Sequence, residues 1–361
     1  MILADAHTDL AYNMRTFGRD YTRAAAETRQ REIGTQTPHH NGDTLLGYPD
    51  WLRGRVGVVF ATLFASPAHK REGPWDTQSY SDPNEAHDLY SRQLDAYHRL
   101  AGEVPDRFRM LTDRRGLGAH LSEWRDPERQ PPVGLVILME GADGVRAPQE
   151  IAEWHARGVR VVGPAWAGTR YAGGTGEPGP LTKDGRRLLQ EMEPLAMILD
   201  LSHLAEEAAR ESLERYDGTV IATHANPRAL MAGSLYPERH LSDEVLEGLI
   251  GRGGVVGIVL YNRFLKAGWT PEEGRAAVPL TRVAEHIDYV CQMAGNARHV
   301  GIGSDFDGGF GVQEVPEGLD TVADLRFIGE MLTSRGYPAS DVEAILGGNW
   351  LGLLARALPE T

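Results

Sequence analysis

Cysteine is nearly absent from this chain of 361 residues, which contains only Cys291. A single cysteine cannot build a disulfide framework within one chain, and it cannot supply the several thiolates of a cysteine-rich zinc site. Cys291 lies in an apolar-periodic run, residues 287–291, where a thiol typically fills space in the core. The sequence therefore excludes a fold that is held together by disulfides.

The chain also lacks an excess of basic residues and any long hydrophobic run. Its 37 lysines and arginines are outnumbered by 51 aspartates and glutamates, a formal net charge of −14, so we expect no nucleic-acid partner. No apolar run approaches the about 18 residues of a membrane span, and no signal-peptide pattern opens the chain. These absences favour a cytoplasmic protein without a membrane partner.

What the chain has is a regular alternation of apolar segments and helical patterns. Eight short apolar segments are typical of parallel strands covered by helices: residues 2–6, 56–63, 133–139, 159–163, 197–202, 219–223, 254–260 and 299–304. Helical patterns lie near residues 81–102, 149–157, 184–195, 205–215, 241–252 and 280–295. The alternation predicts an α/β fold, a single (β/α)8 TIM barrel over residues 1–361. Residues 11–55 are polar, and we expect an irregular insertion that forms a lid on the substrate side.

Metal-binding types of side chain recur where these predicted strands end. Five of the eight strands deliver a histidine, aspartate or glutamate there: His7 and Asp9, Glu140, His203, His224, and Asp305. Each residue alone is more often a helix cap or a hydrogen-bonded core residue than a metal ligand. In a barrel of this type, however, the C-terminal strand ends form the active site. Metal-binding side chains at five strand ends on one edge of the barrel therefore indicate a shared metal site.

Imidazole and carboxylate groups together are the ligand set of zinc and similar divalent ions. His7 and Asp9 are two residues apart on a strand, so they point the same way and can hold one ion. His203 and His224 can hold a second ion, with Glu140 as the natural bridge. Asp305 is then left over, and a free carboxylate beside a metal-bound water is suited to act as a general base. The pattern predicts two Zn²⁺ ions per chain.

Motifs along nearly the whole chain carry a family resemblance. They are Asp5-Ala6-His7-Thr8-Asp9-Leu10, Glu140-Gly141, Gly158-Val159-Arg160, Asp200-Leu201-Ser202-His203, His224-Ala225-Asn226-Pro227-Arg228-Ala229-Leu230, Arg239-His240-Leu241-Ser242-Asp243, Gly303-Ser304-Asp305-Phe306-Asp307-Gly308, Val315-Pro316-Glu317-Gly318-Leu319 and Gly348-Asn349-Trp350. With them the chain resembles the membrane dipeptidase (renal dipeptidase) family of zinc peptidases, a branch of the metal-dependent amidohydrolase barrels. The resemblance implies the same two-zinc site with Asp305 as proton carrier, a dipeptide substrate, and a homodimer.

The resemblance also implies that Arg239 pairs with the α-carboxylate of the substrate. One position departs from the family. Members close to the renal enzyme carry a Thr-His pair whose histidine helps to hold the substrate carbonyl, whereas this chain has Trp166 there, as a bacterial-type subgroup does. This departure bears on the substrate range. Tyr261 follows the seventh strand and is expected at the same mouth, where packing is an equal alternative role.

These observations favour a zinc-dependent dipeptidase whose substrates could include L,D as well as L,L dipeptides. A hydroxide bridging the ions would attack the peptide carbonyl, with Asp305 carrying its proton. The same site could instead serve an N-acyl-amino-acid amidase, a lactonase or a β-lactam hydrolase. Arg239 discriminates, because a neutral lactone has no carboxylate to bind. A non-catalytic metal-binding barrel is a third alternative, which the spare carboxylate of Asp305 disfavours.

Overall fold

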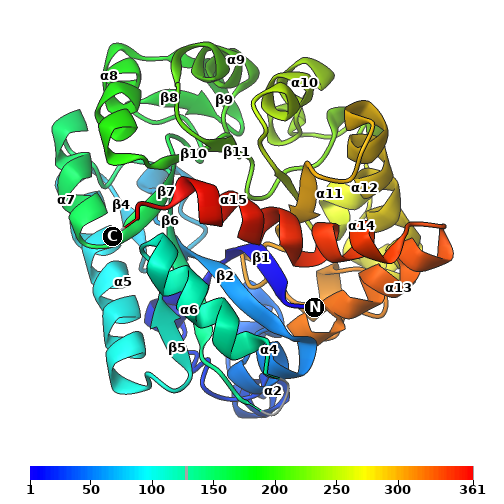
Figure 1. The fold of residues 1–361 in the computed structure, drawn as a ribbon. Helices are drawn as coiled ribbons and strands as arrows, with labels where there is room; N and C mark the ends of the chain where they lie inside the picture. The colour runs from blue at the N-terminus through cyan, green and yellow to red at the C-terminus, as the bar shows by residue number, and fades with distance from the viewer. Residues whose placement is uncertain (127–128, 361) are drawn as a thin grey trace.

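A computed structural model describes residues 1–126 and 129–360 (Figure 1). Eight parallel strands form its barrel: β1 (Leu3–Thr8), β2 (Val56–Leu63), β6 (Val133–Glu140), β7 (Val159–Gly163), β10 (Ile198–Asp200), β11 (Val220–Ile221), β12 (Val256–Ile258) and β13 (Val300–Ile302). Their order is β11-β10-β7-β6-β2-β1-β13-β12. A parallel bridge between Ala222 and Val256 joins the two ends of this order. The prediction of a (β/α)8 barrel is confirmed.

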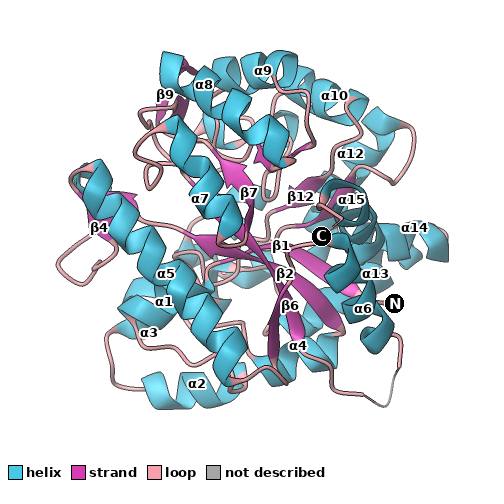
Figure 2. Cartoon of the chain, turned by 60° about the vertical axis from the view of Figure 1, so that its left-hand side comes forward, coloured by secondary structure: helices cyan, strands magenta, loops and turns pink. Residues whose placement is uncertain are grey.

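Helices surround the strands (Figure 2). They are α1 (Leu10–Thr16), α2 (Ala25–Glu32), α3 (Thr37–Asn41), α4 (Tyr48–Gly54), α5 (Pro83–Glu103), α6 (Arg114–Trp124), α7 (Ile151–Ala156), α8 (Lys183–Met192), α9 (Glu206–Arg215), α10 (Asp243–Gly251), α11 (Asn262–Leu265), α12 (Leu280–Ala294), α13 (Arg326–Ser334), α14 (Ala339–Glu343) and α15 (Asn349–Ala357). Helix α5 begins as predicted, because the Asp82 carboxylate accepts the N–H groups of Asn84 and Glu85 at 2.7 and 3.1 Å. Among the described residues, no helix has the length and apolar character needed to cross a lipid bilayer.

Helix α15 closes one end of the barrel (Figure 1). The Trp350 ring packs edge-on against Phe60 at 5.5 Å, and its indole N–H donates to the Ile302 carbonyl at 3.0 Å. Asn349 donates to the carbonyl of Val300, the first residue of β13, at 2.7 Å. A Cβ on Gly301 would lie 2.3 Å from the Trp350 indole nitrogen, so only glycine fits there. This packing leaves the opposite end of the barrel, where the strands finish, free to form a site.

The last four barrel strands are shorter than the sequence predicts. The residues that follow them leave strand geometry, and His203 and Asp305 adopt positive φ angles of 65° and 61°. Such angles are uncommon for residues with a side chain and cluster at functional sites. Helices α6, α11 and α13–α15 lie outside the predicted elements. So does strand β5 (Phe108–Met110), which pairs with the start of β6. Two small pairings, β3 (Ser66–Pro67) with β4 (Ser79–Tyr80) and β8 (Ala172–Gly174) with β9 (Glu177–Leu181), add to the barrel.

Residues 11–55 contain the helices α2–α4 and all but the first residue of α1, so the prediction of irregular structure there was wrong. The pattern is hard to recognise because each helix is short and polar residues flank its few apolar ones. Buried apolar residues nevertheless anchor the segment: Trp51 of α4, and Leu45 and Leu46 in the loop before it, are at most 1% exposed. The role of this segment as a lid stays a prediction.

Candidate metal centre and active site

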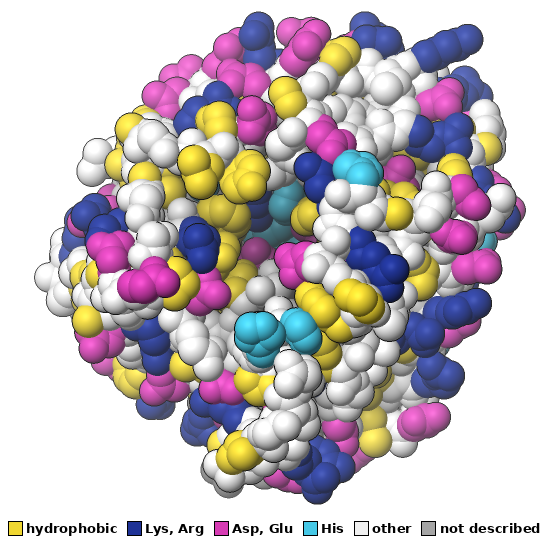
Figure 3. Space-filling view, turned by 180° about the vertical axis from the view of Figure 1, so that it is seen from behind, with side chains coloured by type: hydrophobic (Ala, Val, Ile, Leu, Met, Phe, Trp, Pro, Cys, Tyr) yellow, Lys and Arg dark blue, Asp and Glu magenta, His cyan; other side chains and the backbone are white. Residues whose placement is uncertain are grey.

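The C-terminal ends of the barrel strands open into a cavity of about 340 Å³. Figure 3 shows the hollow from outside, with histidine, basic and acidic side chains at its floor and hydrophobic side chains on its walls. Seven of the nine predicted site residues line it: Asp9, Glu140, Trp166, His203, Arg239, Tyr261 and Asp305. The other two, His7 and His224, are 0% and 1% exposed, and both lie against Glu140. The fold therefore brings all nine residues together.

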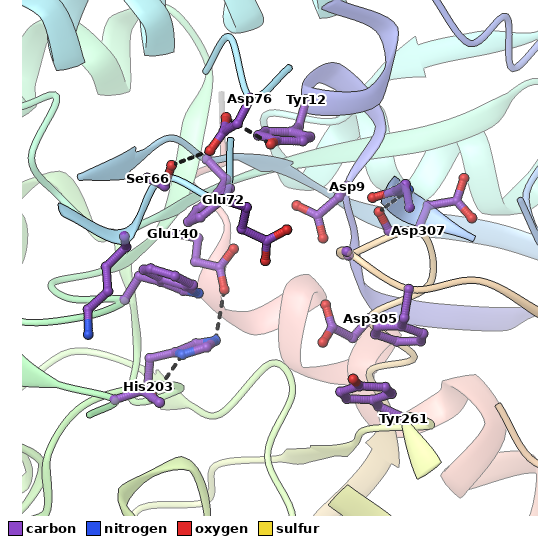
Figure 4. Close-up of a pocket in the computed structure, with 18 of the residues that line it drawn as sticks. Asp9, Tyr12, Ser66, Glu72, Asp76, Glu140, His203, Tyr261, Asp305 and Asp307 are labelled. Carbon is purple, nitrogen blue, oxygen red and sulfur yellow. Dashed lines mark hydrogen bonds and ion pairs between the residues drawn. The ribbon is translucent and has the colours of Figure 1, made fainter. Parts of the chain in front are cut away.

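Glu140 is the last residue of β6, and its two carboxylate oxygens lie near the ring nitrogens of different histidines. Its Oε2 lies 3.5 Å from Nε2 of His7. Its Oε1 lies 2.9 Å from Nε2 of His203 and 3.2 Å from Nε2 of His224 (Figure 4 shows the contact with His203). The two imidazole nitrogens on the Oε1 side are 2.9 Å apart. One oxygen of Glu140 thus faces His7 and the other faces His203 and His224, and the rings of His7 and His224 lie 3.6 Å apart.

On the Oε2 side, His7 is surrounded by acidic groups. Its Nε2 lies 3.5 Å from Oδ2 of Asp9 and 3.8 Å from Oδ1 of Asp305. Two triads have donor atoms within 4.8 Å of one another: His7, Glu140 and His224, and His7, Asp9 and Asp305. Oδ1 of Asp9 is buried without a hydrogen-bond partner among the described residues. A cation would satisfy this carboxylate, so these residues fit a metal ion.

Threonines orient the two histidines on the Oε1 side. The Nδ1 atom of His203 lies 3.0 Å from the Thr175 hydroxyl, and the Nδ1 atom of His224 lies 2.9 Å from the Thr223 hydroxyl. These contacts leave both Nε2 atoms directed at Glu140. A partner on the far ring nitrogen that fixes orientation is a regular feature of metal-binding histidines.

Two buried aspartates that the sequence analysis did not assign tie neighbouring barrel strands together beneath the site. Asp5 accepts the N–H and hydroxyl of Ser304 at 2.7 and 2.5 Å, and Asp200 accepts the same two groups of Thr223 at 2.9 and 2.5 Å. Burial raises the pKa of Asp5 to about 6. Each aspartate lies two or three residues before a predicted histidine ligand, which is a signal that the sequence does contain. These bonds fix the strand ends that carry His7 and His203.

Asp307 is a third buried aspartate with a structural role that the sequence analysis did not assign. It binds partners from residues 19–45: its carboxylate accepts from Arg19 Nη1 at 3.0 Å, the Tyr21 hydroxyl at 2.9 Å, the Thr44 hydroxyl at 2.5 Å and the Leu45 N–H at 2.9 Å. Its carbonyl accepts from the side chains of Asn13 and Asn41 at 2.8 and 3.1 Å. The α1–α4 segment is therefore bonded to the loop that carries Asp305.

The charges in the site favour the metal-binding protonation states of Glu140 and His203, but not that of His7. Burial would lower the pKa of His7, but Glu140 and Asp9 raise it well above its ordinary value. Burial would raise the pKa of Glu140, but the histidines around it hold that pKa well below its ordinary value. Burial, together with the positive charge of Arg239, lowers the pKa of His203 to about 4. Burial raises the pKa of Asp305 well above its ordinary value, with Asp9 adding to the effect. A charged Glu140 and a neutral His203 are the forms that bind divalent cations.

Arg239 is a buried cation with an unused donor. It is 2% exposed; its Nη1 donates to the His224 carbonyl at 2.7 Å, and its Nη2 has no hydrogen-bond partner among the described residues. Its guanidinium lies 5.0 Å from the ring centre of Phe264. The Phe264 ring in turn packs at 4.9 Å against Tyr261, which stacks on Phe310 at 4.3 Å. On this wall Tyr261 is therefore part of an aromatic support.

Trp166 lies on another wall of the cavity. Its ring centre is 6.1 Å from that of His203 and 5.0 Å from that of Phe64, edge-on. The indole is half-buried, so part of its surface is available to a ligand.

Residues 1–358 match the sequence model of the membrane dipeptidase family, peptidase family M19. This chain belongs to that family. Relatives of this membrane dipeptidase family member include the uncharacterized protein in the pqqA 5' region of Klebsiella pneumoniae, 31% identical over 76% of this chain and 98% of that protein. Another is dipeptidase aclJ of Aspergillus oryzae, 27% identical over 99% of this chain and 80% of that protein.

Solved structures of similar proteins agree on the fold. Dipeptidase AC, a metallopeptidase of family M19, superposes with a TM-score of 0.77 at 24% identity over 99% of both chains. A Rhodobacter sphaeroides metallopeptidase, solved with a phosphinate mimic of the dipeptide L-Ala-D-Ala, gives a TM-score of 0.76 at 24% identity over 99% of both chains. The barrel architecture is therefore shared along the full length of these proteins.

Proposed function

We propose that this membrane dipeptidase family member is a zinc-dependent dipeptidase that holds two Zn²⁺ ions per chain. His7 and Asp9 would bind one ion, His203 and His224 the other, and Glu140 both. The division of the Glu140 oxygens between the two donor groups supports this assignment. Bound zinc supplies Lewis-acid polarisation of the scissile carbonyl and activates a water molecule.

The observation that carries the choice of substrate is the buried, unpaired Nη2 of Arg239 in the same cavity. A buried cation with an unused donor costs free energy unless a ligand pairs with it. A guanidinium fits a carboxylate with two parallel hydrogen bonds, so the free C-terminus of a dipeptide is the matching ligand. A neutral lactone would leave this donor unpaired.

Asp305 is proposed as the proton carrier. It lines the cavity and lies 3.8 Å from Nε2 of His7, within reach of the centre of the donor cluster. A carboxyl group whose pKa is raised by burial can accept a proton and give it to the departing amine near neutral pH. Trp166 and Tyr261 are proposed to contact the substrate side chains, Trp166 through its half-buried indole face.

The test compares a dipeptide with its C-terminal amide on zinc-loaded protein. Because only the free acid can pair with Arg239, we expect its kcat/KM to exceed that of the amide at least about tenfold, which is about 1.4 kcal/mol of transition-state stabilisation. Arg239→Met should remove most of this preference and leave the zinc content unchanged. Both L,L and L,D dipeptides belong in the screen, since the R. sphaeroides neighbour was solved with a mimic of an L,D dipeptide. Equal cleavage of acid and amide by the unmodified protein would instead favour an amidase.

A further inference from the structure

The cavity wall opposite Tyr261 carries two carboxylates, Glu72 and Asp76, from the segment between β3 and β4 (Figure 4). Asp76 is held in place by the hydroxyls of Tyr12 and Ser66 at 3.0 and 2.9 Å. Glu72 makes no hydrogen bond or ion pair with the residues that the structure describes, and Figure 4 shows its carboxylate directed into the cavity. One acidic side chain is thus fixed, and the other is free to meet a ligand.

Aromatic rings stand beside these carboxylates. Trp75, Tyr12 and Phe64 line the same cavity. The Trp75 ring stacks on His40 at 4.5 Å and on Phe17 at 5.6 Å, which fixes its orientation. Aromatic faces next to a carboxylate form a favourable environment for an ammonium or guanidinium group, because the ring faces and the carboxylate both carry negative electrostatic potential.

Among the described residues, no lysine or arginine forms an ion pair with Glu72. Burial and Asp76 raise the pKa of the Glu72 carboxyl, and His40 opposes that shift. Lys70 lines the cavity, but its ammonium pairs with Glu177 at 3.1 Å. Arg239 lies toward the opposite wall, against the Phe264 ring that packs on Tyr261. Its buried Nη2 is unpaired and independently indicates that the cavity takes a charged ligand. The cavity therefore presents an open cation at one end and an open carboxylate at the other.

We propose that Glu72 is a specificity-determining residue that selects dipeptides whose first residue has a cationic side chain, of the arginine or lysine type. The inference rests on the proposed dipeptidase function. With the C-terminal carboxylate at Arg239 and the scissile carbonyl near Glu140, the first residue of an extended dipeptide extends toward Glu72 and Asp76. Its long side chain would lie along Trp75 and end at the Glu72 carboxylate.

The experiment compares L-Arg-L-Ala with L-citrulline-L-Ala, which has nearly the same shape but no charge. The citrulline dipeptide lacks both the ion pair with Glu72 and the cation–π contact, so kcat/KM should favour the arginine dipeptide at least about fivefold. Glu72→Gln removes only the ion pair, so it should lower this ratio at least about twofold, and Glu72→Lys should bring it below one. The measured quantity is the ratio of the two kcat/KM values, so a general loss of activity that lowers both values equally does not change it.

Glu314→Gln is the matched control. Glu314 is a partly exposed carboxylate near Tyr261 that pairs with Arg263 at 3.4 Å, and the variant changes the net charge by the same amount. It should keep the ratio of the unmodified protein. The inference is overturned by a ratio near one in the unmodified protein, by a ratio that survives Glu72→Gln, or by an equal loss in Glu314→Gln. Cleavage of both dipeptides at equal rates would refute this inference alone, whereas cleavage of neither would refute the dipeptidase function and the inference with it.

Discussion

Glu140 occupies the position where histidines from the ends of three other barrel strands converge. His7 approaches one of its oxygens, and His203 and His224 approach the other. A carboxylate can serve two ions only if each oxygen faces a different set of ligands, and this side chain has that arrangement. Removing it should therefore affect both proposed ions, whereas removing one histidine should affect one ion first.

The first prediction concerns zinc content. Protein reconstituted with zinc and freed of excess metal should contain about two ions per chain by elemental analysis. The zinc content should fall toward about one ion per chain in His203→Ala and in His224→Ala. It should be lower still in Glu140→Ala. A single ion in the unmodified protein, or a Glu140→Ala variant that keeps both ions, would contradict the shared site.

Asp305 is held in an uncommon backbone conformation at the edge of the donor cluster. Its φ is 61°, and a Cβ on Gly308 would lie 2.3 Å from its Oδ1 and 2.8 Å from Oδ2 of Asp9. Only glycine fits at position 308, because the two carboxylates approach its backbone closely. Such crowding of acidic groups fits a site that a cation neutralises, and it leaves Asp305 close enough to His7 to be either a ligand or a proton carrier.

The second prediction separates these two roles. If Asp305 moves protons, Asp305→Asn should retain both zinc ions and lower kcat by about 10²-fold or more, because the amide cannot accept the proton. Kinetics and elemental analysis on the same preparation give the answer. Loss of an ion along with activity would make Asp305 a ligand, and unchanged kcat in a fully metal-loaded variant would assign the base to another group.

At the scale of elements, the α1–α4 segment and the loop after β13 depend on each other through Asp307. Arg19 connects them: its Nη1 pairs with Asp307 at 3.0 Å, and its Nε and Nη2 pair with both oxygens of Glu32 at 2.9 and 3.1 Å. The three side chains are at most one-tenth exposed. In this setting the loss of one partner leaves uncompensated charge in the interior.

The third prediction follows from that burial. Arg19→Met should lower the free energy of unfolding by about 3–5 kcal/mol, the usual cost of breaking a buried ion pair. Arg23→Met is the control, because Arg23 pairs with Asp20 and Glu27 on the surface of the same segment, so its loss should lower the free energy of unfolding much less than Arg19→Met does. Chemical denaturation of both variants measures the difference. Equal losses would show that the buried network does not stabilise the fold.

At the scale of the whole molecule, stability depends on histidines that burial keeps neutral. His286, on α12, is 1% exposed, and its Nε2 lies 3.4 Å from the Leu265 carbonyl. Burial lowers the pKa of His286 to about 4 from an ordinary value of 6.5. A lowered folded-state pKa means that the unfolded chain takes up the proton first as the pH falls. The stabilisation is therefore complete above pH 6.5 and is lost as the pH falls through about 4.

The fourth prediction measures this contribution. The gap between the two pKa values corresponds to about 3 kcal/mol of stability. His286→Gln keeps a donor for the Leu265 carbonyl but cannot titrate, so its free energy of unfolding should fall about 2–3 kcal/mol less than that of the unmodified protein between pH 7 and pH 4. Denaturant titrations at the two pH values provide the comparison. If the free energy of unfolding falls equally in the variant and in the unmodified protein, His286 does not contribute to acid destabilisation.

Several properties of the whole molecule were predicted and stay predictions. They are the homodimer, the cytoplasmic location, the single-domain organisation over residues 1–361, and the closure of residues 11–55 over the site. The bonds between Asp307 and this segment show that any movement of the segment would act on the loop that carries Asp305.

The sequence by itself determined the barrel and the set of donor residues. Apolar runs and helical periods are local signals, so eight strands and six of the helices around them could be found without coordinates. The histidines and carboxylates at the strand ends followed, because parallel strands of a barrel place their C-terminal ends together. The early ends of the strands after β7 and the helices α1–α4, α6, α11 and α13–α15 were not predicted, since tertiary contacts rather than periodicity decide where they begin and end.

Only the tertiary structure decided which atoms meet. The division of the Glu140 oxygens, the unpaired Nη2 of Arg239 and the anchoring of Asp307 by residues from α1–α4 all join segments that are far apart in the chain. The same holds for the wall that Glu72 and Asp76 form, whose residues carry no recognisable motif. Distances and burial arise from packing, and a linear pattern of residue types does not contain them.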